Sequence, residues 1–147
     1  MVWLYLLFAF AGGAVLPFQV GINAQLAGWL YSPVRAAFVS FVVGSLVLLV
    51  AAALVFKPLP SWGRLGDAPW WVWIGGALGA FYVAASIVTA PRLGAATLIA
   101  LVVAGQAVAS LLIDQFGWVG FHQKHVSAGR AIGMVLVGAG VALVRLF

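Results

Sequence analysis

Several polar side chains interrupt the apolar stretches of this sequence at intervals of one helical turn. Gln19 and Asn23 are four residues apart, and both carry an amide. Gln106, Ser110 and Asp114 repeat the same spacing. Residues three or four apart share one face of a helix. Because amides and hydroxyls donate and accept hydrogen bonds without charge, these two faces are suited to binding a small polar solute. The alternative is that they form hydrogen bonds between helices.

Three more hydroxyl residues follow one another at helical spacing, namely Tyr82, Ser86 and Thr89. A tyrosine near the middle of a membrane span is a candidate solute contact, because an unpaired polar group is costly in hydrocarbon. Serine and threonine hydroxyls can instead bond to carbonyls of their own helix. We therefore expect a binding role for Tyr82 and a structural role for the smaller hydroxyl residues, Ser40, Ser45, Ser86 and Thr89.

The chain has few residues that could carry out acid–base or nucleophilic catalysis. There is no cysteine and no glutamate, and Asp67 and Asp114 are the only acidic side chains. A thiol mechanism needs a cysteine, and glycosidase-type chemistry needs two paired carboxylates. No glycine-rich phosphate loop, Ser-His-Asp set or metallopeptidase motif occurs. The sequence therefore predicts a protein that is not an enzyme and that uses no cofactor.

The composition is that of a membrane protein. Of the 147 residues, 66% are hydrophobic and 6% are charged, whereas an average soluble domain is about 45–50% apolar and about 25% charged. The uncharged runs Ala36–Phe56 and Leu93–Ile113 are long enough to cross a bilayer. We expect an all-α integral membrane protein in contact with lipid. The formal net charge is +5, but its basic residues are scattered, so nucleic acid is not an expected partner.

Polar breaks divide the chain into five predicted transmembrane helices within a single domain, residues 1–147. The helices are expected at about 2–29, 33–56, 70–89, 92–116 and 127–146. Pro17 and the glycine pair before it predict a kink or local unwinding in the first helix. Pro33 is expected in the first turn of the second helix, where proline is well tolerated. The segment Lys57-Pro58-Leu59-Pro60 is expected to end this helix. A short turn at Ala90-Pro91 is expected between the third and fourth helices.

Basic residues are divided almost evenly between the two membrane faces. With five helices, the two termini lie on opposite faces. The N-terminal face, side A, receives Lys57, Arg64, Lys124 and Arg130, and side B receives Arg35, Arg92 and Arg145. Because the bias in lysine and arginine sets orientation, four against three favours insertion both ways. Two inverted copies would form an antiparallel ten-helix dimer of the inverted-repeat kind. The alternatives are one weakly preferred orientation or a paralogous partner chain of opposite orientation.

The two polar faces are expected at opposite depths of one chain. Gln19 and Asn23 lie nearer side B, whereas the series from Gln106 to Asp114 lies nearer side A. Inverting a second copy brings its series to the depth of the first copy's amides. We therefore expect a composite substrate site with Gln19 and Asn23 from one chain and Gln106 and Ser110 from the other. Since no acidic side chain is expected near the midplane, this site favours a small polar or zwitterionic solute over a lipophilic cation.

Asp114 has two interpretations. It is expected near the side A interface, where Lys124 or Arg130 could pair with it across a short loop. Alternatively, it is a protonatable gating or coupling carboxylate. His122 and His125 have a spacing that could hold a metal, but their loop offers no third good ligand besides Asp114, so no metal site is expected.

Four stretches of the sequence resemble one known family. They are GAVLPFQVGINAQL at 13–26, PWWVWIGGALGAFYV at 69–83, PRLGAATL with GQAVASLLIDQFG within 91–117, and GRAIGMVLVGAGV at 129–141. The chain resembles the YdcZ-type branch of the drug/metabolite transporter superfamily along nearly its whole length. The resemblance implies a bacterial five-helix inner-membrane protein that acts as a dual-topology homodimer, a paired heterodimer or a fused ten-helix chain. The motif positions that it covers are Gln19, Asn23, Tyr82, Gln106, Ser110 and Asp114.

These observations predict a multi-pass secondary transporter of the bacterial inner membrane. It would move a small polar metabolite by alternating access in an antiparallel dimer. The alternative is a non-transporting membrane subunit or one half of an obligate heterodimer with another protein. The related small multidrug exporters rely on a glutamate in their first helix, and this chain has none.

Overall fold

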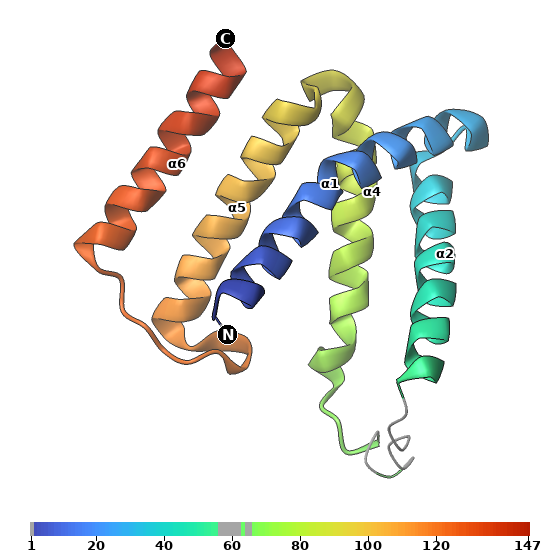
Figure 1. Cartoon of the computed structure of the whole chain (residues 1–147), viewed down its shortest axis with the longest axis horizontal. Helices are drawn as coiled ribbons and strands as arrows, with labels where there is room; N and C mark the ends of the chain where they lie inside the picture. The colour runs from blue at the N-terminus through green and yellow to red at the C-terminus, as the bar shows by residue number, and fades with distance from the viewer. Residues whose placement is uncertain (1, 56–62, 64–65) are drawn as a thin grey trace. The chain divides into compact units, whose positions relative to one another are not determined.

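The computed structural model describes residues 2–55, 63 and 66–147 (Figure 1). The basic residues Lys57 and Arg64 and the helix stop expected at Lys57–Pro60 lie outside the described residues. The elements run in the order α1 (Val2–Leu30), α2 (Pro33–Leu54), the 3-10 helix η1 (Trp70–Ile74), α4 (Gly75–Leu93), α5 (Ala95–Phe116), the 3-10 helix η2 (Trp118–Gly120) and α6 (Ala128–Leu146).

The described part of the chain contains five helical segments long and apolar enough to cross a bilayer. They are Val2–Leu30, Pro33–Leu54, Trp70–Leu93, Ala95–Phe116 and Ala128–Leu146. A chain in hydrocarbon must satisfy every backbone N–H and C=O within itself, and a helix does so locally. The prediction of an all-helical protein with five spans is therefore confirmed.

Local sequence signals explain several helix ends. The Ser32 side chain accepts a hydrogen bond from the Arg35 N–H at 3.3 Å, and Pro33 occupies the first turn of α2. Ser127 caps α6 in the same way, accepting from the Arg130 N–H at 3.4 Å. Both serines satisfy N–H groups that have no partner within the helix. Gly117 ends α5 in the left-handed conformation that glycine adopts most readily.

Two details of the helices differ from expectation. α1 is one helix from Val2 to Leu30, so the local unwinding expected near Pro17 does not occur in this described segment. The helix loses only the hydrogen bond that Pro17 cannot donate, and its neighbouring turns remain intact. The turn expected at Ala90-Pro91 is wrong, because α4 continues through Pro91 to Leu93. The chain turns at Gly94, whose φ of 75° and ψ of 162° suit glycine and few other residues.

The conformation of Gly94 leads to a stability prediction. Gly94→Ala should destabilise the protein by about 1–3 kcal/mol, because a Cβ atom is strained in this backbone region. Thermal unfolding of the purified protein in detergent measures the change. Gly105→Ala is the matched control: Gly105 lies within α5, and a Cβ there meets nothing within 4 Å. Its effect should be at most about 1 kcal/mol. Equal destabilisation by both substitutions would contradict the assignment of the turn to Gly94.

The chain divides into two compact units, Met1–Arg92 and Leu93–Phe147. In the first unit, the core is formed by Ala36 and Ala37 of α2 with Val83 and Ile87 of α4. Ala36 is fully buried, so the small side chains of α2 lie directly against the larger ones of α4. Partly buried side chains near the end of α1 pack against this cluster, namely Leu26, Ala27 and Leu30.

In the second unit, α5 and α6 lie side by side and are joined by the segment that contains η2 (Figure 1). The rings of Phe116 and Trp118 stack at the end of α5, with centroids 5.0 Å apart. The unit is thus a helical hairpin whose connection carries most of its polar contacts.

Candidate functional site

The two amides of α1 lie against α4. Gln19 and Asn23 line one pocket together with Tyr82 and Ser86 of α4, and the remaining lining residues are aliphatic. Asn23 is 5% exposed and Ser86 is 3% exposed. Three of the sequence-predicted site residues, Gln19, Asn23 and Tyr82, are therefore neighbours within a single chain. This polar cluster of Gln19, Asn23, Tyr82 and Ser86 is called the α1–α4 cluster below.

The α1–α4 cluster is closed and incompletely bonded. The space among its side chains is too small to hold a water molecule. The hydroxyl oxygen of Tyr82 is buried and has no hydrogen-bond partner among the described residues. Leaving a buried hydroxyl unpaired costs about 1–3 kcal/mol. A polar group that bonded to the Tyr82 hydroxyl would recover that cost.

Ser40 of α2, for which the sequence predicts only a structural role, lies near the amides of α1. It lines a groove of about 350 Å³ with Gln19 and Asn23, and a second cavity of about 190 Å³ with Gln19. The hydroxyl of Ser40 thus lies on the same side of unit Met1–Arg92 as the amides of α1. The sequence does contain a signal for this position. Ser40 and Gly44 are four residues apart, so they place two small residues on one face of α2. Ser86, for which a structural role is expected, is buried beside Asn23, and that role stays a prediction.

Thr89 behaves as its residue type predicts. Its hydroxyl donates to the Ala85 carbonyl of the same helix at 2.8 Å. This bond satisfies the hydroxyl locally, as threonine commonly does within helices. The structural role expected for Thr89 is confirmed.

Gln106 and Ser110 lie on α5 with exposed side chains in unit Leu93–Phe147. Exposed polar groups on a helix that crosses hydrocarbon need a partner or water. Their expected meeting with Gln19 and Asn23 of a second copy involves two chains, and it stays a prediction.

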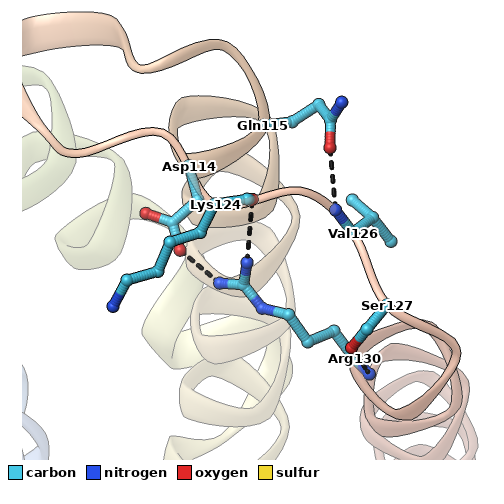
Figure 2. A network of polar contacts seen from close by, with 6 residues as sticks. All are labelled: Asp114, Gln115, Lys124, Val126, Ser127 and Arg130. Atoms are coloured by element: carbon cyan, nitrogen blue, oxygen red, sulfur yellow. Dashed lines mark hydrogen bonds and ion pairs between the residues drawn. The ribbon is translucent and has the colours of Figure 1, made fainter.

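Asp114 pairs with Arg130, one of the two partners expected for it. The Arg130 guanidinium donates to the Asp114 carboxylate and also to the Lys124 carbonyl, the latter at 3.1 Å (Figure 2). The Lys124 N–H donates to the Asp114 carbonyl at 2.7 Å. The pair therefore ties the end of α5 to the first turn of α6. A role of Asp114 in gating or coupling stays a prediction.

Gln115 organises the same loop and was not singled out from the sequence. Its side-chain oxygen accepts from the Val126 N–H at 2.8 Å (Figure 2), and its carbonyl accepts from the Gln123 side chain at 2.9 Å. Its side-chain nitrogen lies 3.3 Å from Nδ1 of His125. No sequence pattern marks Gln115 as the organiser of this loop. Its partners follow it by eight to eleven residues in an irregular segment, so they do not lie at a helical spacing.

Within residues 2–55, 63 and 66–147, no three His, Cys, Asp or Glu side chains are grouped so that they could hold a metal ion. His122 and His125 are both exposed in the α5–α6 loop. The contact with Gln115 gives His125 a structural partner.

The geometry of the loop predicts different results at two neighbouring basic residues. Arg130→Gln should destabilise the hairpin by up to about 1 kcal/mol and speed amide hydrogen exchange in residues 117–127, because it removes a half-exposed ion pair and a bond to Lys124. Lys124→Ala should change neither quantity, since Lys124 contributes its backbone to the network. Hydrogen exchange with mass spectrometry measures both. Faster exchange in the Lys124 variant alone would contradict this assignment.

Comparisons with known proteins agree with the architecture. Residues 4–143 match the family described as "Putative inner membrane exporter, YdcZ". The chain is similar to the inner membrane protein YdcZ of Escherichia coli strain K12, with 32% identity over 143 residues, which cover 96% of this chain and 94% of that protein. No solved structure matches.

Proposed function

Because the chain belongs to the YdcZ family of inner membrane exporters, we propose that it exports a small polar solute by alternating access in an antiparallel dimer. Family membership makes the protein a transporter rather than an enzyme. The five apolar helices of its described residues, together with its relatives, make it a multi-pass protein of the inner membrane. The solute class, the dimer and the access cycle are the parts that the proposal adds.

The α1–α4 cluster carries the proposal. Gln19, Asn23 and Tyr82 bring amide and phenol groups together in a segment where polar groups are costly. A purely structural cluster would be expected to pair all its groups, whereas the Tyr82 hydroxyl has no partner among the described residues. The cluster contains no charged side chain. It therefore suits an uncharged or zwitterionic polar solute better than a lipophilic cation.

The proposed second half of the site comes from an inverted copy. Four basic residues on one face against three on the other favour insertion in both orientations. At equal depth, the second copy would offer Gln106 and Ser110 toward Gln19 and Asn23. Inverted repeats of this kind bind substrates at their interface near the midplane. Breaking the Asp114–Arg130 pair is proposed as the gating step at the end of α5.

Cross-linking tests the composite site directly, because the chain has no cysteine. Co-expressed Asn23→Cys and Ser110→Cys chains, differently tagged, should form a covalent heterodimer with a short bifunctional maleimide. Leu112→Cys replaces Ser110→Cys as the control, since two residues along a helix point to a different face. Asn23→Cys and Ser110→Cys would also be combined in one chain. If cross-links form only within that chain and never between two chains, the composite site is refuted.

Efflux from liposomes tests the export function. The purified chain would be reconstituted alone into vesicles loaded with a defined mixture of isotope-labelled amino acids, sugars and amides. We expect protein-dependent efflux of at least one of these solutes, and none of tetraphenylphosphonium. Export of that cation without polar solutes would refute the solute class. No efflux of any probe would favour the alternative of a non-transporting subunit or an obligate heterodimer.

A further inference from the structure

A groove between α1 and α2 adjoins the amides of α1. Its volume is about 350 Å³. Three polar residues form one part of its lining, Gln19, Asn23 and Ser40. The rest of the lining is apolar and includes Phe18, Ile22 and Val43. Unlike the α1–α4 cluster, this groove has room for a small molecule.

The lining of the groove has the composition of a ligand site. Pockets for small molecules have volumes of about 300–1,000 Å³ and apolar walls with a few polar groups that orient the ligand. No charged side chain of the described residues lines the groove, so a head with a net charge would lose its hydration without compensation. A plain hydrocarbon chain would leave two amides and a hydroxyl facing apolar matter, which is also unfavourable. A molecule with an uncharged polar end and an apolar body matches both parts of the lining.

We propose that the α1–α2 groove binds a solute with an uncharged amide or hydroxyl head joined to an apolar group. Ser40 holds the head together with Gln19 and Asn23, and the apolar group lies against Phe18, Ile22 and Val43. This inference rests on the proposed export function and names the class of its solute. It also adds Ser40 to the residues that contact the solute.

Protection of a single cysteine tests the groove. Val43→Cys, in phosphatidylcholine nanodiscs, would be labelled with N-ethylmaleimide at increasing concentrations of octanamide. Val47→Cys is the matched control, because it is the same residue type one turn further along α2, is 63% exposed and does not line the groove. We expect octanamide to slow labelling several-fold at position 43 and to leave position 47 unchanged. Ile22→Cys, on the opposite wall, provides a second reporter if Val43→Cys does not fold.

The hydroxyl of Ser40 is tested in the same assay. Ser40→Ala should weaken protection by octanamide about fivefold, the effect of losing one hydrogen bond. Ser45→Ala should leave protection unchanged, since Ser45 lies on the same helix outside the groove lining. Octylammonium and octanoate, which carry charged heads, should protect far less than octanamide.

Three results would overturn the proposal. Equal protection by octane and octanamide would mean that the groove binds a bare acyl chain. A cysteine at position 43 that reacts in detergent but never in nanodiscs, while the cysteine at position 47 reacts in both, would mean that another helix, such as one of a second copy, covers the groove. No protection by octanamide, with solute efflux intact, would refute the groove and leave the export function standing. Protection by octanamide without efflux of any solute would refute export and leave the binding site standing.

Discussion

Asn23→Ala is expected to lower the rate of solute efflux from liposomes about tenfold or more. Asn23 is 5% exposed and lines both the α1–α4 cluster and the α1–α2 groove. Removing its amide would delete the hydrogen bond proposed between Asn23 and the solute and would leave the solute's polar group unpaired in an apolar site. A loss of about 1.4 kcal/mol corresponds to a factor of ten. The measurement is initial efflux at fixed protein density in the membrane.

Gln25→Ala is the matched control for this experiment. Gln25 is an amide on the same helix, two residues further along, and its side chain is exposed. Both substitutions place a strong helix former in α1, so neither is expected to disrupt the helix itself. Efflux should remain near the wild-type rate in the Gln25 variant. If the two variants lose efflux equally, or if Asn23→Ala retains the wild-type rate, the site is not at Asn23.

A cysteine added after Phe147 is expected to be labelled from outside intact cells in about half of the molecules. The chain has no other cysteine, so an impermeant maleimide reports the C-terminus alone. Half labelling follows from the near balance of basic residues, four on side A and three on side B. Labelling after permeabilisation gives the total. Nearly complete or nearly absent labelling in intact cells would contradict dual insertion and direct the search to a partner chain.

Charge variants should shift this fraction in opposite directions. Arg145→Gln leaves four basic residues on side A against two on side B, so side A should stay inside and external labelling should rise. Lys57→Gln combined with Lys124→Gln leaves two against three, so external labelling should fall. Lys124 and Arg145 lie outside the α1–α4 cluster and the α1–α2 groove. If neither change alters the fraction of molecules labelled from outside, something other than these charges sets the orientation.

The helices of this protein could be predicted because their signals are local. An uncharged stretch of bilayer length in hydrocarbon has to satisfy its own backbone, and a helix does this within a few residues. Ser32 with Pro33, and Ser127, mark helix starts that the structure shares. The turn predicted at Ala90-Pro91 lies instead at Gly94. Pro91 is tolerated within α4, whereas Gly94 adopts the backbone conformation that the turn requires.

The ion pair of Asp114 could also be predicted in part from the sequence near it. A carboxylate near a helix end, followed by a short loop with two basic residues, has few partners within reach. The choice of Arg130 over Lys124 depended on the path of the loop, in which Gln115 bonds to Val126 and Gln123. That path includes positive φ at Gly117, Val119 and Gly120, which no periodic pattern encodes.

The amino-acid sequence was sufficient to define which residues are polar, which helix carries each of them and how they are spaced along it. It did not define which helix faces meet. In a soluble protein the apolar face of a helix points to the core, but here the apolar side chains are equally suited to lipid, so amphipathicity gives no direction. Only the packing of Ala36 and Ala37 against Val83 and Ile87 brings α4 to the amides of α1, and Ser40 joins them through the α1–α2 groove. The α1–α4 cluster is a product of close side-chain packing between distant segments, which spacing along a single helix does not specify.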